Sequence, residues 1–72
     1  MRSSNVLLIK VNGEPREVEP ETPLSTLVNL LNLKPEQIAI ELNKEVVRRA
    51  NWEVTLLRED DQVEIVHFVG GG

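Results

Sequence analysis

The 72-residue sequence has no cysteine, which excludes both a disulfide framework and a thiolate metal site. Aromatic residues are scarce, with one Trp, one Phe and no Tyr, so the stacking platforms of single-strand nucleic-acid binders are missing. No apolar run approaches the roughly 20 residues that span a bilayer. The first residues do not have the pattern of a secretory signal. These absences predict a cytoplasmic protein with neither nucleic-acid nor membrane partners.

The charge balance supports the same conclusion. Twelve acidic residues against eight basic ones give a net charge of −4, which repels phosphate backbones. A chain of this length forms one domain around one small core, and we therefore predict a single domain over residues 1–72.

The first clear local pattern is a β-hairpin. Residues 6–11 form a β-rich run that ends at Asn12-Gly13, and residues 15–19 read as a second, more polar strand. Because Asn and Gly both tolerate positive φ, this pair favours the two-residue type I′ turn.

One amphipathic helix follows. Thr22 is the expected N-cap and Pro23 the expected first helical residue. Asn32 and Pro35 mark the end of the helix and the following loop. Residues spaced at i, i+3, i+4 and i+7 place one apolar stripe on the core side, namely Leu24, Leu27, Val28 and Leu31.

The remaining elements are short strands. Residues 38–42 predict a third strand, 43–45 a turn, 46–48 a short fourth strand and 62–68 the last strand, with an irregular or 3₁₀ segment over 49–52. A helix between the hairpin and the third strand predicts that this strand runs parallel to the one before the helix. The expected fold class is α+β, a mixed four- to five-stranded sheet packed on one main helix, of the β-grasp kind.

The chain ends in three glycines directly after its last strand, and this tail, residues 69–72, is the first candidate site. Glycine has no Cβ, so Gly70 and Gly71 suit a channel too narrow for side chains. Four extended residues reach about 13 Å. The group that such a tail would present is the carboxylate of Gly72.

No catalytic constellation or metal-ligand set is visible in the sequence. His67 is the only histidine and has no second ligand near it in sequence. Residues 59–61 form an acidic cluster, which we interpret as a solvated turn. Alternation places Val66 and Phe68 on the sheet face turned away from the helix, where they either form a docking patch or are covered by a loop or by Trp52.

The sequence resembles one known family, the ThiS-type sulfur carriers of thiamine biosynthesis. The resemblance covers nearly the whole chain, and its parts occur in the family's order: Asn12-Gly13, the helical leucines Leu27, Leu30 and Leu31, residues 40–47, Arg49, Trp52, residues 61–66 and the glycine ending.

This resemblance implies a carrier that is not itself an enzyme and binds no cofactor. A ubiquitin-activating-type adenylyltransferase would use ATP and magnesium to adenylate Gly72. A cysteine-derived sulfur donor would then convert the adenylate to a thiocarboxylate, and thiazole synthase would receive the sulfur. Gly70 and Gly71 would enter the partners' active sites, while Val66 and Phe68 would help to dock the domain.

The sequence departs from the family pattern at two places. Asp60-Asp61 stands where the family usually has Gly-Asp, which makes a different turn geometry possible. The chain ends in three glycines where the family usually has two, so trimming would move the functional carboxylate to Gly71. Alternative functions are a molybdopterin-type sulfur carrier, a ubiquitin-like protein modifier and a β-grasp interaction module with an inert tail.

Overall fold

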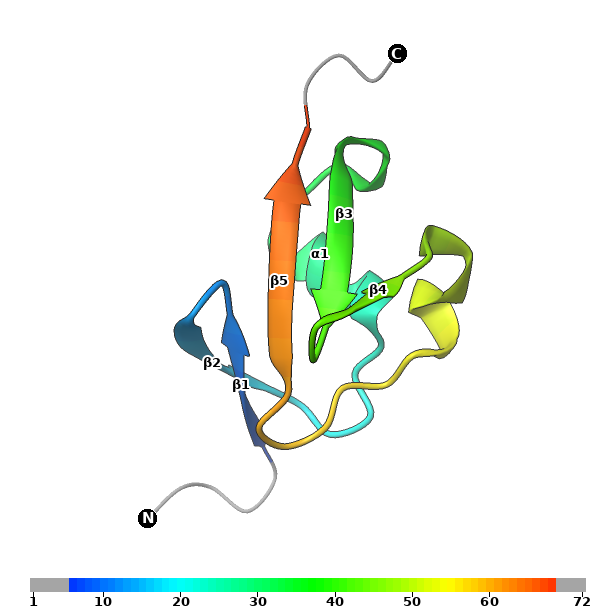
Figure 1. Cartoon of the computed structure of the whole chain (residues 1–72). Coiled ribbons are helices and arrows are strands. Elements are labelled where there is room, and N and C mark those ends of the chain that lie inside the picture. The colour runs from blue at the N-terminus through cyan, green and yellow to red at the C-terminus, as the bar shows by residue number, and fades with distance from the viewer. Residues whose placement is uncertain (1–5, 69–72) are drawn as a thin grey trace.

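The computed structural model describes residues 6–68 (Figure 1). Its elements, in chain order, are β1 (Leu7–Val11), β2 (Glu14–Val18), α1 (Leu24–Leu30), the 3₁₀ turn η1 (Pro35–Gln37), β3 (Ile38–Leu42), β4 (Glu45–Val47), the 3₁₀ segment η2 (Arg49–Val54) and β5 (Gln62–His67). The predicted fourth and fifth strands are present, with β4 starting one residue earlier than expected and β5 ending one residue earlier. The glycine tail and the outer limits of the predicted domain lie outside the described residues.

The five strands form one mixed sheet in the order β2-β1-β5-β3-β4. β5 is the central strand; it runs parallel to β1 and antiparallel to β3. Since β2 and β3 are both antiparallel to strands of one shared direction, they run the same way, as predicted for the strands on either side of the helix. This is the β-grasp arrangement that the sequence predicts.

The first hairpin has the predicted turn. Asn12 and Gly13 both have positive φ, 50° and 85°, as a two-residue type I′ turn requires. The second hairpin, between β3 and β4, also has two positive-φ residues, Asn43 at 52° and Lys44 at 74°. The predicted turn over 43–45 is therefore shorter by one residue, because Glu45 already pairs with Leu42.

The start of α1 differs from the prediction. The N-cap position is Pro23, and none of the described side chains caps the helix. The Thr22 hydroxyl instead donates to the Glu19 carbonyl oxygen at 2.7 Å, while the Leu24 N–H donates to the Thr55 carbonyl oxygen at 2.9 Å. The backbone of the segment after η2 thus does the capping that was expected of Thr22.

The helix ends as predicted, at a left-handed asparagine. Asn32 has a φ of 59°, and its N–H donates to the Asn29 carbonyl oxygen. The Leu33 N–H reaches back to the Val28 carbonyl oxygen at 3.1 Å, which completes a Schellman motif.

One core lies between α1 and one face of the sheet. The predicted stripe is confirmed, because Leu24, Leu27 and Val28 are buried and Leu31 packs against the core half-buried. The helix lies behind the sheet in Figure 1, so no helix formed by residues 6–68 covers the opposite sheet face, called the open face below. Among residues 6–68 there is no helix with the length and apolar character to cross a membrane.

Candidate functional site: the exit of the last strand

The candidate site is the end of β5, where the chain leaves the sheet. The Phe68 N–H donates to the Gln37 carbonyl oxygen at 3.0 Å, which fixes the backbone one residue beyond the strand. The predicted carboxylate at Gly72, its alternative at Gly71 and the tail residue Gly70 all lie outside the described residues. What the structure defines is therefore the base from which residues 69–72 start.

Asn12 holds β5 from the β1 side. Its side-chain Oδ1 accepts a hydrogen bond from the Ile65 N–H at 2.7 Å, and its Nδ2 donates to the Ile65 carbonyl oxygen at 3.3 Å. The amide side chain thus continues the backbone ladder past the last regular pair of β1, Val11 with Val63. Asn12 makes these contacts from a turn position with positive φ.

Asn43 does the same from the β3 side, at the start of β5. Its N–H donates to the Gln62 carbonyl oxygen at 2.8 Å, and its Oδ1 accepts from the Gln62 N–H at 3.0 Å. Its Nδ2 donates to Asp61 Oδ1 at 3.0 Å. Two asparagines in two hairpin turns therefore bind the strand that leads to the tail.

The interpretation of the acidic cluster as a solvated turn is confirmed for Glu59 and Asp60, which are exposed in a turn, and is wrong for Asp61. Its side chain is only 9% exposed, and Oδ2 accepts from the Arg58 N–H at 2.7 Å. Asp60 beside it is exposed with a φ of 69°, in the left-handed region that glycine occupies at lower cost. Glu59 Oε1 accepts from the Leu8 N–H at 3.2 Å. Two carboxylates of the cluster therefore hydrogen-bond to the backbone, Glu59 to strand β1 and Asp61 to the loop itself.

The predicted docking residues lie exposed beside the exit. Val66 is 57% and Phe68 46% exposed, so neither is covered by a loop or by Trp52 within the described residues. Trp52 is buried instead, and its Nε1 donates to the Val47 carbonyl oxygen at 2.8 Å. The docking role of Val66 and Phe68 stays a prediction.

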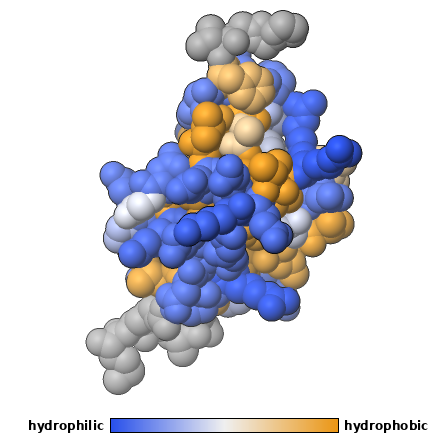
Figure 2. Space-filling model, viewed as in Figure 1, coloured by the Kyte–Doolittle hydropathy of each residue, from blue (hydrophilic) through white to orange (hydrophobic). Residues whose placement is uncertain are grey.

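Two further residues enlarge this apolar surface, which we call the open-face patch: Ala39, Val46, Val66 and Phe68. Ala39 pairs directly with Val66, and Val46 is 70% exposed on β4. Figure 2 shows hydrophobic surface gathered over this part of β5 and β3, bordered by hydrophilic side chains. The alternation of residues 38–42 would have identified Ala39 as outward-facing, but its place beside Val66 depends on the register between β3 and β5.

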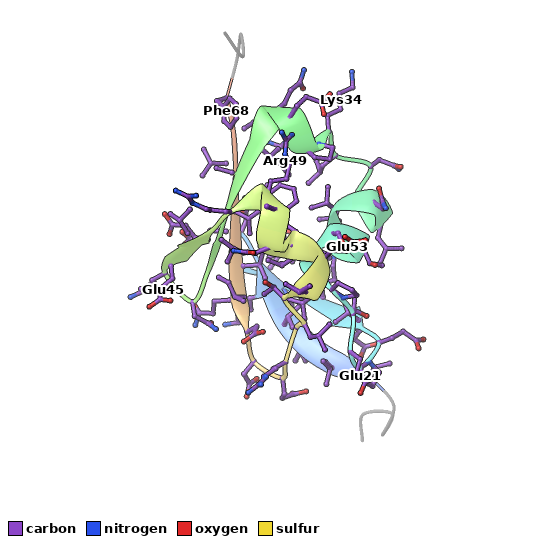
Figure 3. All side chains as sticks on the ribbon, turned by 90° about the vertical axis from the view of Figure 1, so that its right-hand side faces the viewer. Glu21, Lys34, Glu45, Arg49, Glu53 and Phe68 are labelled. Carbon is purple, nitrogen blue, oxygen red and sulfur yellow. The ribbon has the colours of Figure 1, made fainter. Side chains whose placement is uncertain are left out.

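A shallow groove of about 290 Å³ runs from the patch to the β4 edge of the sheet. Its walls include Phe68, Trp52 and the two arginines that follow β4, Arg48 and Arg49. Figure 3 places Arg49 and Lys34 at the same end of the molecule as Phe68. The surface next to the chain exit is thus apolar with a cationic edge.

His67 is exposed at the end of β5, beyond the buried Val63 and Ile65 with which it alternates. Within residues 6–68, no three His, Cys, Asp or Glu side chains are grouped so that they could hold a metal ion.

Comparison with known proteins points to one family. A family model described as the ThiS family matches residues 9–72. The sulfur carrier protein ThiS of Bacillus subtilis strain 168 is 32% identical over 68 residues, which cover 90% of this chain and 100% of that protein.

A thiazole synthase of Magnetococcus marinus is 48% identical over 64 residues, or 89% of this chain. This region is only 20% of that protein, so the chain spans about a fifth of its length. Among solved structures, a thiamine biosynthesis protein (ThiS) from Geobacter metallireducens superposes with a TM-score of 0.80 at 32% identity. That similarity covers 92% of this chain and 100% of the Geobacter chain.

Proposed function

Because the chain belongs to the ThiS family, we propose that it is the sulfur carrier of thiamine biosynthesis and that its terminal glycine carboxylate carries the sulfur as a thiocarboxylate. The observation that carries the proposal is the family match over residues 9–72. This range includes both strand β5, which Asn12 and Asn43 bind, and the tail. The Bacillus relative, which is named a sulfur carrier and is covered over its whole length, supports the same function.

The proposed chemistry begins with activation, because a carboxylate is a poor electrophile. A ubiquitin-activating-type adenylyltransferase, using ATP and magnesium, joins the Gly72 carboxylate to AMP and releases pyrophosphate. The terminal sulfur of a cysteine-derived persulfide then attacks the acyl carbon and AMP leaves. A thiol reduces the resulting acyl disulfide, and the thiocarboxylate is free to react. If the tail is trimmed by one residue, Gly71 takes this role.

In this proposal the domain holds out its terminal carboxylate to the active sites of other enzymes. It is a protein-tethered substrate rather than an enzyme, as group carriers are. The central strand β5 is bound on both sides, and the Phe68 N–H is bonded to Gln37, so the residue from which the tail starts is held beside the open-face patch. The glycines Gly70 and Gly71 have no side chains to exclude them from a narrow channel. The similarity to thiazole synthases supports thiazole synthase as the partner that accepts the sulfur.

The test is intact-mass measurement. After incubation with the adenylyltransferase, ATP, magnesium, a sulfur donor and a thiol, the chain should gain about 16 Da, the replacement of one oxygen by sulfur in a carrier of this type. A chain that lacks Gly71 and Gly72 should gain nothing. Absence of the product from the full chain, with the enzyme active on another carrier, would overturn the proposal. A covalent adduct with protein lysines would support a ubiquitin-like modifier instead.

A further inference from the structure

The open face carries a pair of like charges at its centre. Glu41 on β3 and Glu64 on β5 are direct cross-strand partners, and Val46 on β4 completes the same row. Two residues further along, Ala39 and Val66 form the next row on the same face. Alternation along β5 places Glu64, Val66 and Phe68 on this one face, so the two carboxylates directly adjoin the open-face patch.

This arrangement has a cost in the free chain. Like charges placed directly opposite each other on neighbouring strands destabilise a sheet. No described side chain forms an ion pair with either glutamate. Glu41 is also half-buried, so its charge has less contact with water than an exposed one. Within residues 6–68, therefore, nothing neutralises the pair.

Opposite charge lies at the edge of the sheet beside the patch. Arg48 and Arg49 line the groove at the β4 edge together with Phe68. The open-face patch thus adjoins two acidic groups on the open face and two basic groups at the β4 edge. A complementary protein surface would bring a basic side chain to the glutamates, apolar side chains to the patch and an acidic side chain to the arginines.

We propose that Glu41 and Glu64 determine partner specificity by receiving a Lys or Arg side chain of the adenylyltransferase. This inference rests on the proposed function. Four residues span at most about 13 Å when fully extended, so an enzyme whose active site receives the end of the chain must place its surface close to the open-face patch. An active site that binds ATP phosphates is electropositive, and the chain's net charge of −4 would be steered towards it.

The two negative charges then have opposite effects on the energy of the complex and of the free chain. In the complex, a cation between Glu41 and Glu64 removes their repulsion and gains two charge-assisted hydrogen bonds. In the free chain the repulsion remains. If the two glutamates had only a structural role, a substitution would change stability and affinity in the same direction. In the proposed role, a neutral substitution raises the stability of the free chain and lowers its affinity for the enzyme.

The experiment measures binding of the same organism's purified adenylyltransferase to Glu64→Gln and Glu64→Lys variants at low and high salt. We expect the dissociation constant at low salt to rise about five- to tenfold for E64Q and more for E64K, with a weaker salt dependence than the wild type. The free E64Q chain should melt at a higher temperature than the wild type. The matched controls are Glu53→Gln and Glu53→Lys, at an exposed site on η2 beside α1 (Figure 3), and they should alter affinity by less than about twofold.

Several results would overturn the inference. One is unchanged affinity for E64K, and another is an equal loss in E53K, which would indicate only the effect of net charge. Sensitivity of thiazole synthase binding alone, or a wild-type dimer that E64K dissociates in sedimentation, would assign the surface to another occupant. The mass assay on the wild-type chain separates failure of this inference from failure of the proposed function. If the proposed function is wrong, the wild-type chain forms no thiocarboxylate with an enzyme proven active.

Discussion

The side chain of Asn12 pairs with the backbone of Ile65, 53 residues later in the sequence, as though it were a further residue of strand β1. One hydrogen bond is donated by the Ile65 N–H and the other is accepted by its carbonyl oxygen, at 2.7 and 3.3 Å. Ile65 is 7% exposed, so water has little access to replace these bonds. A residue that sequence reasoning assigned only to a turn also binds the strand that leads to the tail.

Replacing Asn12 by Gly should test this link. Glycine accepts the positive φ of the turn, so the change removes the side-chain hydrogen bonds without straining the backbone. We expect a loss of about 1–3 kcal/mol in the free energy of unfolding, because the Ile65 N–H is left unsatisfied in a buried strand. Urea denaturation measures the loss, and hydrogen exchange should show faster exchange at the Ile65 amide. Unchanged exchange there would contradict the proposed clamp.

Replacing Asp61 by Ala should also destabilise the chain. The Asp61 carboxylate accepts hydrogen bonds from the Arg58 N–H and from Asn43 Nδ2, and the residue is nearly buried. Its removal leaves both donors without this partner, which costs about 1–3 kcal/mol. Thermal and denaturant unfolding measure the change.

The neighbouring Asp60 provides a control of opposite sign. It is exposed with a φ of 69°, so Asp60→Gly should stabilise the chain by about 0.5–1 kcal/mol by relieving left-handed strain. Equal destabilisation by both changes would mean that the loop responds to any substitution and that Asp61 has no special role.

Lys44→Gly should stabilise the second hairpin. Lys44 occupies the position in its two-residue turn that Gly13 occupies in the first hairpin, and both have positive φ. Relief of left-handed strain exceeds the extra freedom that glycine gives the unfolded chain, which leaves a net gain of about 0.5–1 kcal/mol. The midpoint of urea unfolding should rise. The reverse change, Gly13→Lys, should lower it, and a fall in both variants would contradict the assigned turn type.

Phe68→Ala should weaken docking without unfolding the domain. Phe68 is 46% exposed beside the chain exit, so its truncation costs the core little, and if Phe68 docks as predicted it removes contact area from the complex. We expect kcat/KM for thiocarboxylate formation, with the chain as varied substrate, to fall by the equivalent of about 1–2 kcal/mol. Val54→Ala is the control, since Val54 is 76% exposed on η2 and outside the open-face patch. An equal fall for both variants would argue against a specific docking surface.

The features that the sequence predicted are those encoded by neighbouring residues. Asn12-Gly13 specifies its own turn, and the stripe from Leu24 to Leu31 specifies its own buried face. Asn32 likewise ends α1 through its own conformation and nearby carbonyl groups. In each case the energetic preference depends on a few consecutive residues.

The features that it missed depend on residues far apart in the chain. Thr22 is a residue type that commonly serves as an N-cap, but its hydroxyl donates to the Glu19 carbonyl oxygen. The first helical N–H, that of Leu24, donates instead to the Thr55 carbonyl oxygen. The burial of Asp61 follows from its contact with Asn43, which only the assembled sheet provides. Similarly, the pairing of Glu41 with Glu64 requires the register of β3 against β5. Local propensity carries no information about any of these contacts.

The central position of β5 bears on how the chain matures. β5 is the last of the described elements to be synthesised, yet it is the strand that joins the β1–β2 hairpin to the β3–β4 hairpin. Until it has left the ribosome the two hairpins have no shared neighbour, and completing the sheet requires closing a loop of nearly the whole domain. A translation product that stops before β5 therefore has two separate hairpins and no finished sheet.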